Sequence, residues 1–294
     1  MIDLHMHTKN SDGSDTTEEL IKKAEGMKLK YISITDHDNV HAHEEISDRH
    51  LEKLFSGKII TGIEIKCIYK KRTIEVLGYK YDLNKMSEWV TNFYKDKSKE
   101  VLQRKYFDKT YDACKQLGFK LTEKAKIDWN PKTDWASFTI YSDLKKYKEN
   151  EGIYADDILN DFTTFNKKYC GDMNSILYID KSDDYPSLET AIKAIKDAGG
   201  LVFVAHVFIY KAIKDKQAFI NDLIENYDID GFECYHSEFT DDQIQYLLNL
   251  TKEKGLLRSG GSDYHGINKK GIDMATGKGN LKIDESLVED WIWD

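Results

Sequence analysis

The first fifteen residues read MIDLHMHTKNSDGSD (1–15), and they place two histidines next to a carboxylate. IDLHMH (2–7) is predicted to form a short strand that carries His5 and His7, and Asp12 follows in the next loop. The pattern is typical of a metal centre, although a strand with one buried and one exposed histidine has the same sequence. A metal centre is indicated only if other segments of the chain supply further metal ligands.

The composition indicates an ordinary globular protein. The chain has 294 residues, of which 40% are hydrophobic and 32% charged, enough for one large domain or for one domain with a substantial insertion. The formal net charge of -9 argues against a stable nucleic-acid partner, which usually requires a basic face. It does not exclude an anionic substrate, because bound metal ions can reverse the local field.

The cysteines and the apolar runs indicate the cellular compartment of the protein. Four cysteines without a CxxC pair predict reduced, mostly buried thiols and a cytoplasmic protein. We see no signal peptide, and apolar runs such as LVFVAHVFIY (201–210) are too short to cross a bilayer. We therefore expect no membrane association.

Strands and helices alternate at both ends of the chain. The first part predicts strands over 31–35, 58–65 and 73–81, with helices over 17–27, capped by Thr16 or Thr17, and 42–55. The last part predicts helices over 187–200, 211–226 and 240–254, with strands over 201–206, 231–236 and from 256. This alternation is typical of βα units around a parallel sheet or barrel. Residues 82–186 are predicted to form a mostly helical insertion between residues 1–81 and 187–294.

Most of the predicted strands deliver a potential metal ligand at the carboxyl end. Such ends converge on one mouth of a βα barrel. Imidazoles and carboxylates without thiolates suit Zn, Mn or Fe, and their number exceeds what one ion needs, so Glu64 is expected to bridge two ions. Each motif alone has an ordinary structural explanation, and His41, His43 and His50 are expected to be surface or capping residues. The strand-end candidates are His5, His7, Asp36, His37, Glu64, Glu75, His206, Glu233, His236, Asp263 and His265.

Taken together, the motifs resemble the PHP (polymerase and histidinol phosphatase) family. The resemblance rests on DLHMHT, SDGS, ITDHD, GIE, VLGY, VAH and GGSDYHG, in family order, over residues 1–80 and roughly 187–294. Among its branches, the chain is most similar to the stand-alone metal-dependent phosphoesterases. The resemblance implies an α/β fold, a distorted (β/α)7 barrel, and two or three divalent metal ions.

The resemblance also implies roles for individual residues. Asp3 and Asp36 would orient ligating imidazoles. One metal would be held by His5, His7, Glu64 and Asp263, a second by Asp12, His37 and His265, and a third by Glu64, Glu75 and His206.

Two departures from the family pattern affect these implications. Glu75 stands where the family usually has histidine before VLGY, which puts the third metal in question. The stretch WASFTIYSDL (135–144) lacks the Arg and His of the family's RPH segment, so phosphate recognition must differ there. The change from AHP to AHV at residues 205–207 is minor for ligation.

The ligand set and the resemblance both predict a hydrolase that acts on phosphate esters through a metal-bridging hydroxide. His236 would donate a proton or contact phosphate, unless it only packs against Tyr235 or Tyr264, and Glu233 would orient a ligand. The expected substrate is a small phosphomonoester or a nucleotide. Aromatic residues of the insertion could stack on a base or form its own core, and the insertion could act as a lid.

The sequence leaves three alternatives to this function open. Histidinol-phosphate hydrolysis uses the same metal chemistry. Amidohydrolase barrels also carry His-x-His on the first strand, although Asp12 and SDYH favour phosphate esters. A non-catalytic metal-binding barrel is favoured only by the loss of histidine before VLGY.

Overall fold

The computed structural model describes residues 1–293 and divides the chain into two compact units. One unit holds residues 1–91 and resumes at residue 185, and the other holds residues 92–184. The boundaries expected from the sequence were 81/82 and 186/187. Each unit has its own hydrophobic core, and the candidate ligands all belong to the first.

Seven strands form one sheet in the first unit, in the same order as in the chain. They are β1 (Ile2–Asp3), β2 (Tyr31–Ile34), β3 (Lys58–Tyr69), β4 (Arg72–Tyr79), β5 (Leu201–Val204), β6 (Gly231–Tyr235) and β7 (Leu257–Gly260). The two edges of the sheet meet, because the Leu4 amide donates to the Gly260 carbonyl at 3.1 Å and the Asp263 amide donates to the His5 carbonyl at 2.8 Å. The predicted distorted seven-stranded barrel is therefore confirmed.

Strand β4 runs against both of its neighbours, whereas the other neighbouring pairs are parallel. Lys70 and Lys71, with φ of 45° and 66°, turn the chain from β3 to β4, as in a two-residue hairpin. Two residues cannot make the crossover that a parallel pair needs. The expected parallel arrangement is thus wrong at β4. Glu75, expected at a strand's carboxyl end, lies in the first half of β4 and reaches the common mouth because this strand is reversed.

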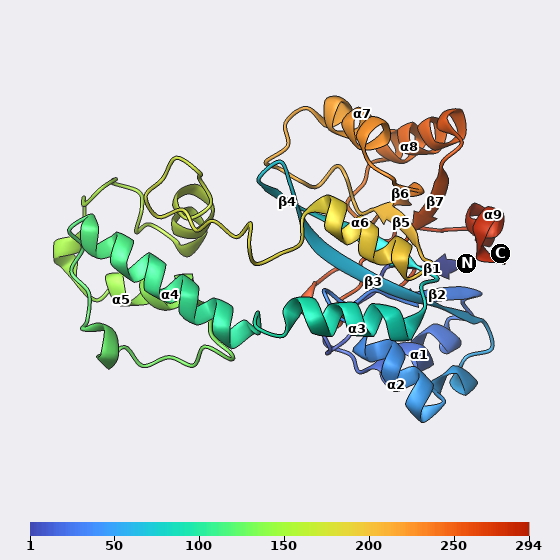
Figure 1. The fold of residues 1–294 in the computed structure, drawn as a ribbon, viewed down its shortest axis with the longest axis horizontal. Helices are drawn as coiled ribbons and strands as arrows, with labels where there is room; N and C mark the ends of the chain where they lie inside the picture. The colour runs from blue at the N-terminus through green and yellow to red at the C-terminus, as the bar shows by residue number, and fades with distance from the viewer. Residues whose placement is uncertain (294) are drawn as a thin grey trace. The chain divides into compact units, whose positions relative to one another are not determined.

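Helices surround the strands of this unit, with α1 and α2 on one side and α7 and α8 on the other (Figure 1). Thr16 caps the first helix in a reciprocal capping box with Glu19, as its side chain suggested. The α-helices of this unit are α1 (Thr17–Gly26), α2 (His41–Arg49), α6 (Leu188–Asp197), α7 (Lys216–Asn226), α8 (Asp241–Lys254) and α9 (Glu289–Ile292). Helix α3 (Leu83–Tyr94) begins in this unit and ends in the other.

The first strand and two helices differ from the sequence prediction. Strand β1 ends at Asp3 and not at residue 7, so His5 and His7 follow the strand and are not part of it. Helix α2 ends at Arg49, because His50 takes a left-handed backbone with φ of 55° and a 3-10 turn follows over Leu51–Leu54. Helix α7 begins at Lys216, capped by Asp215, and not at residue 211. His43, expected at the surface, is buried, and its Nε2 lies 2.8 Å from the Ile34 carbonyl oxygen.

The second unit carries α4 (Lys99–Gln116), α5 (Ala136–Leu144) and shorter helical turns, joined by segments without regular structure. Tyr106 and Phe107 belong to its buried core, and the Phe107 ring stacks on Trp129 with centroids 4.5 Å apart. Trp135 instead keeps 62% of its surface exposed. The aromatic residues of the insertion therefore serve mainly as its core, and the role of this unit as a lid stays a prediction.

Two other expectations from the sequence concern the cysteines and membranes. All four cysteines are free thiols, and Cys67, Cys114 and Cys234 are buried. Within residues 1–293, no helix combines the length and the apolar character that a membrane span requires.

Candidate metal centre

The predicted ligands converge at one mouth of the barrel, around a cavity of about 470 Å³. They arrive from loops after β1, β2, β5 and β7 and from within β3 and β4. The cavity is lined by Asp12, His37, Glu64, Glu75, His206, Ile209, Asp263, His265, Asn268 and Lys269. His5 and His7 lie beneath it and are fully buried.

The first predicted ligand set forms a compact cluster of four donor atoms. Glu64 Oε2 lies 3.3 Å from the Nε2 atoms of both His5 and His7. Asp263 Oδ1 lies 3.7 Å from His5 Nε2 and 3.4 Å from His7 Nε2. Ligands in a tetrahedral site with bonds of about 2.0–2.1 Å lie about 3.3 Å apart. The donor atoms of His5, His7 and Glu64 therefore gather as ligands of one ion would, and Asp263 lies beside the two histidines.

Unpaired imidazole nitrogens give a second, independent indication of metal binding. His5 Nε2, His7 Nε2 and His37 Nδ1 are buried without a hydrogen-bond partner in residues 1–293. A buried polar atom without a partner costs free energy. A metal ion among these nitrogens would remove that cost, so the residues fit the expected group.

The second predicted set gathers around Asp12. Its carboxylate oxygens lie 3.1 Å from His265 Nε2 and 3.7 Å from His37 Nε2. His7 joins this cluster, with Nδ1 3.7 Å from Asp12 Oδ1. Partial burial by itself raises the pKa of Asp12, but the hydrogen bond from His265 and the nearby imidazoles hold it far below its usual value. Asp12 is thus a carboxylate at any physiological pH.

The third predicted set is looser and shares its region with a lysine. His206 Nε2 lies 2.8 Å from Glu64 Oε1 and 3.5 Å from Glu75 Oε2. On the other side of Glu75, its Oε1 lies 3.3 Å from Lys66 Nζ, and the two residues are paired across β3 and β4. Burial lowers the pKa of Lys66, but Glu75 and other nearby acidic groups together outweigh this and raise it above its usual value, so the lysine stays charged. One carboxylate oxygen of Glu75 is therefore already neutralised.

Glu233 contacts two of the candidate ligands, His5 and His206. Its Oε1 accepts a hydrogen bond from His5 Nδ1 at 2.7 Å, and its Oε2 accepts one from the His206 amide at 2.8 Å. A carboxylate on Nδ1 fixes the tautomer that leaves Nε2 free for a metal. His265 is held similarly, because its Nδ1 donates to the Asp263 carbonyl at 2.9 Å.

Asp3 and Asp36 act on the backbone of ligand-bearing loops, and not on imidazole rings as expected. Asp3 accepts hydrogen bonds from the amides of His5, Ser262 and Ala275, which ties β1 to the segment after β7. Asp36 accepts from the Thr8 amide at 2.7 Å and from the Ser11 hydroxyl at 2.6 Å. Both side chains thus set the positions of ligands one or two residues away.

The position of His236 does not fit the predicted proton donor. Its side chain is fully buried, Nδ1 accepts from the Glu238 amide at 3.1 Å, and Nε2 lies 3.1 Å from Asp263 Oδ2. With Nδ1 as acceptor, Nε2 carries the proton and donates to Asp263. This geometry makes His236 a residue that orients Asp263.

Two ligand positions have strained backbones. His206 and Asp263 adopt φ of 28° and 58°, a region that residues other than glycine rarely occupy. Such strain is concentrated at functional sites, where the surrounding structure enforces it. Here it turns both side chains toward the cluster immediately after β5 and β7.

Sequence reasoning missed two lysines at the centre. Lys66 lies two residues after Glu64 on β3, so the period of a strand places both side chains on one face, and this signal could have found it. Lys269 lies in the loop after His265 and contacts Asp263 Oδ2 through Nζ. Nothing in the local sequence distinguishes it from the neighbouring Lys270.

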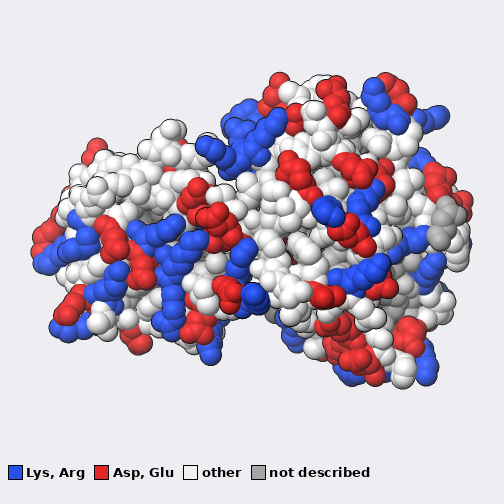
Figure 2. Space-filling model, in the orientation of Figure 1, with Lys and Arg blue, Asp and Glu red and all other residues white. Residues whose placement is uncertain are grey.

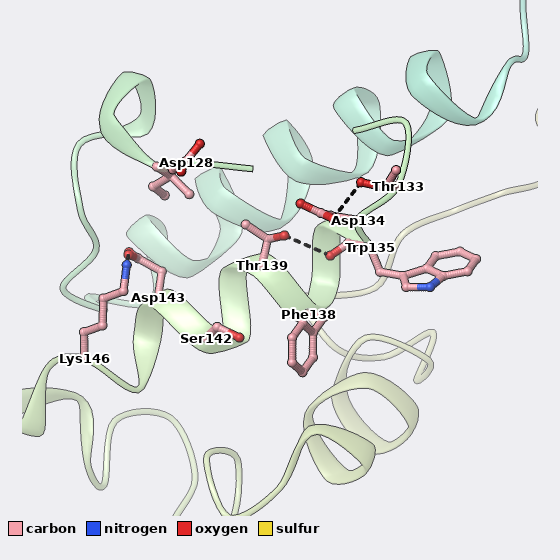
Figure 3. A pocket seen from close by; sticks show the side chains of 10 residues that line it. Asp128, Thr133, Asp134, Trp135, Phe138, Thr139, Ser142, Asp143 and Lys146 are labelled. Carbon is pink, nitrogen blue, oxygen red and sulfur yellow. Dashed lines mark hydrogen bonds and ion pairs between the residues drawn. The ribbon is translucent and has the colours of Figure 1, made fainter. Parts of the chain in front are cut away.

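A second cavity, of about 450 Å³, lies in the other unit beside α5 (Figure 3). It is lined by Ile127, Asp128, Thr133, Asp134, Trp135, Phe138, Thr139, Ser142, Asp143 and Lys146. Two of its acidic residues have local partners, with Asp143 paired to Lys146 and Asp134 to Thr133, and the Trp135 and Phe138 rings point away from Asp143. It contains no histidine and no cluster of ligands.

The family of the chain follows from its match to a protein-family model. The model described as PHP domain matches residues 3–200. The chain belongs to the PHP family. The resemblance inferred from the motifs is therefore confirmed.

Individual relatives and a solved structure are named for phosphate-ester chemistry. A 5'-3' exoribonuclease of Haemophilus influenzae is 27% identical over 98% of this chain and 97% of its own length. A 3',5'-nucleoside bisphosphate phosphatase of Chromobacterium violaceum is 24% identical over 93% of this chain and 90% of its own. A structure from Bifidobacterium adolescentis, assigned as a metal-dependent phosphoesterase, superposes with a TM-score of 0.62 at 23% identity, covering 98% and 94% of the two chains.

These PHP comparisons confirm the reaction class predicted from the sequence. The relatives are hydrolases of phosphate esters, and this chain is a PHP hydrolase of the same reaction class. The His, Asp and Glu cluster indicates divalent metals, without specifying which or how many.

Proposed function

We propose that the protein is a metal-dependent phosphoesterase that hydrolyses a phosphate ester bond of a nucleotide or of the end of a short nucleic-acid strand. The observation that carries this proposal is the pair of donor sets at the barrel mouth with unpartnered imidazole nitrogens between them. Nitrogen and oxygen donors without thiolates suit Zn, Mn or Fe. When bound, such ions activate water and neutralise the charge of a phosphate ester.

The side chains of the chain have separate tasks in this proposal. His5, His7, Glu64 and Asp263 hold one ion, while Asp12, His37 and His265 hold a second. Glu233 and His236 fix the orientation of His5 and Asp263. Since His236 is buried, the leaving group takes its proton from water or from a side chain at the open mouth.

The third ion of the family pattern is weak or absent in this proposal. Lys66 already neutralises one oxygen of Glu75, and its ammonium would repel a further cation. We therefore expect two tightly bound ions per chain. The substitution Lys66→Met should strengthen binding of a third ion, and Glu75→His should do so more strongly.

Elemental analysis checks the prediction on Lys66. The wild type, Lys66→Met and Glu75→His are compared after loading with the same metal and desalting. Three tightly bound ions in the wild type would contradict the role of Lys66. The substitution Lys70→Met is a matched control, because Lys70 pairs with Asp222 at the surface, away from the mouth.

The substrate class is inferred from the relatives. Of the relatives that align over at least 90% of both chains, two are named for action on RNA or nucleotides, and a third is named a phosphoribosyl 1,2-cyclic phosphate 1,2-diphosphodiesterase. A cavity of about 470 Å³ lies in the range that holds a small ligand. On the face shown in Figure 2, acidic and basic side chains are interspersed, without the broad basic surface that long nucleic acids favour. A mononucleotide or the end of a short strand is therefore the proposed substrate.

The cysteines support a location in the cytoplasm. Four free thiols, three of them buried, are typical of a reducing compartment. We propose a cytoplasmic enzyme on this basis.

A side-by-side substrate panel tests the proposed function. Metal-loaded protein is assayed with nucleoside monophosphates, nucleoside bisphosphates, a short 5'-phosphorylated RNA, histidinol phosphate and an amide substrate. We expect kcat/KM to be highest for one of the nucleotide substrates, and Asp263→Asn should abolish turnover. A preference for histidinol phosphate or for the amide would contradict the proposal, as would no turnover with any substrate.

A further inference from the structure

The mouth of the metal centre has an uneven distribution of charge. Among the ten residues that line it in the described part of the chain, four are carboxylates and three are imidazoles. Lys269 is the one permanent cation in this set. A phosphate ester enters as an anion, so a cation at the mouth is the expected complement to its oxygens that face away from the metals.

The ammonium of Lys269 lies directly beside the metal-ligand cluster. Its Nζ contacts Asp263 Oδ2, whereas Asp263 Oδ1 faces His7 Nε2 at 3.4 Å. Asp263 thus presents one oxygen to the metal position and the other to Lys269. About a third of the Lys269 side chain (32%) is exposed, and the residue lines the cavity, so its ammonium is accessible to a ligand there.

The segment that carries Lys269 is fixed to the loop that carries Asp12. The Asn268 side chain donates to the Asp12 carbonyl at 2.9 Å, and the Ile267 amide donates to the Ser14 hydroxyl at 3.0 Å. Gly266 packs so closely that an added Cβ would lie 1.8 Å from Ser14 Oγ. Lys269 therefore projects from an anchored turn, which lowers the cost of holding its ammonium at the mouth.

We propose that Lys269 binds the substrate phosphate and thereby sets the affinity of the enzyme for phosphate esters. This inference rests on the proposed function and adds to it a residue that contacts the ligand. Lys66 does not compete for the role, because it is engaged by Glu75 and does not line the cavity. The contact of Lys269 with Asp263 keeps its ammonium in place until a phosphate enters.

Binding of inorganic phosphate to the metal-loaded protein tests the proposal without turnover. Calorimetry is performed on the wild type, Lys269→Met, Lys269→Arg and the matched control Lys270→Met. Lys270 is adjacent, exposed and outside the cavity, so its substitution removes the same charge elsewhere. We expect Lys269→Met to weaken phosphate binding about tenfold or more, because a charge-assisted hydrogen bond is lost. Lys269→Arg should recover part of the affinity, and Lys270→Met should change it less than twofold.

Measurements of metal content and kinetics distinguish a loss of phosphate binding from a loss of metal. Elemental analysis should give equal metal content in all four proteins, and Lys269→Met should raise KM for the best substrate more than it lowers kcat. Unchanged phosphate affinity in Lys269→Met, no phosphate binding in the wild type, or metal loss in Lys269→Met alone would each overturn the proposal. If the wild type binds phosphate through Lys269 but hydrolyses no phosphate ester, the proposed function fails while the assignment of Lys269 stands.

Discussion

At the scale of single residues, the centre depends on carboxylates that hold imidazoles in one orientation. His5 illustrates this, because its two ring nitrogens face different carboxylates. Nδ1 is bonded to Glu233 at 2.7 Å, while Nε2 faces Glu64 at 3.3 Å without a hydrogen bond. The first contact fixes the ring so that the second nitrogen can bind a metal.

The substitution Glu233→Gln should weaken metal binding by about 10- to 100-fold, because the amide no longer fixes the His5 tautomer. Competition with a chromophoric chelator measures this change. Glu238→Gln is the matched control, since Glu238 pairs with Lys278 at the surface and is 39% exposed. Equal metal affinity in both variants would contradict the role of Glu233.

The ionisation of His206 predicts a pH dependence of metal binding. Burial lowers its pKa, but the hydrogen bond and the negative charge of Glu64, together with Glu75, raise it to about 9. This exceeds the value of about 6.5 in an unfolded chain. The proton on His206 therefore stabilises the metal-free fold below about pH 6.5, and this stabilisation is lost as pH rises through 9.

A metal ion held by Glu64 would repel the proton on His206, which lies 2.8 Å from the other oxygen of Glu64, so metal affinity should increase from pH 6.5 to 9 and then level off. Titrations in buffers with different heats of ionisation should show proton release at pH 7.5. His206→Gln should release fewer protons per metal bound. Proton release that is identical in the two proteins would contradict this prediction.

At the scale of elements, the closure of the sheet brings the ligands of β1 and β7 together. Gly261 lies where the two strands are closest, and an added Cβ would lie 2.4 Å from the His5 amide nitrogen and 2.5 Å from His5 Cβ. Real side chains do not approach backbone so closely. The glycine is therefore required for the position of His5 beside Asp263.

The substitution Gly261→Ala should force the ends of β1 and β7 apart, with a loss of about 1–3 kcal/mol in the free energy of unfolding. It should also reduce the metal content of the protein. Gly26→Ala is the control, because a Cβ there meets no atom within 4 Å in α1. Chemical denaturation and elemental analysis measure both effects, and wild-type values for Gly261→Ala would contradict the argument.

At the scale of the whole molecule, only one of the two units contains the metal centre. The unit of residues 92–184 has a separate core that includes Phe165 and Ile140, and no predicted ligand lies in it. Ligands bind and stabilise the fold that contains their site. Metal removal should therefore affect the two units differently.

Calorimetry with and without a chelator should show two thermal unfolding transitions, and the chelator should shift the midpoint temperature of only one of them. The barrel transition should fall in temperature without metal, because the stabilisation that a metal gives by binding only the folded barrel is then lost. A metal at 100 times its Kd contributes about 2.7 kcal/mol to stability. Equal shifts of both transitions, or no shift, would contradict the expected independence of the units.

The sequence by itself determined the candidate ligands and most of the strands, because both follow local rules. Strand periodicity, the cap at Thr16 and the histidine and carboxylate motifs each extend over a few residues. Only the tertiary structure decided which way β4 runs, that His236 is buried against Asp263, and that Lys66 and Lys269 stand beside the ligands. These facts depend on contacts between segments far apart in the chain, where the neighbours of a side chain determine its burial, its charge and therefore its role.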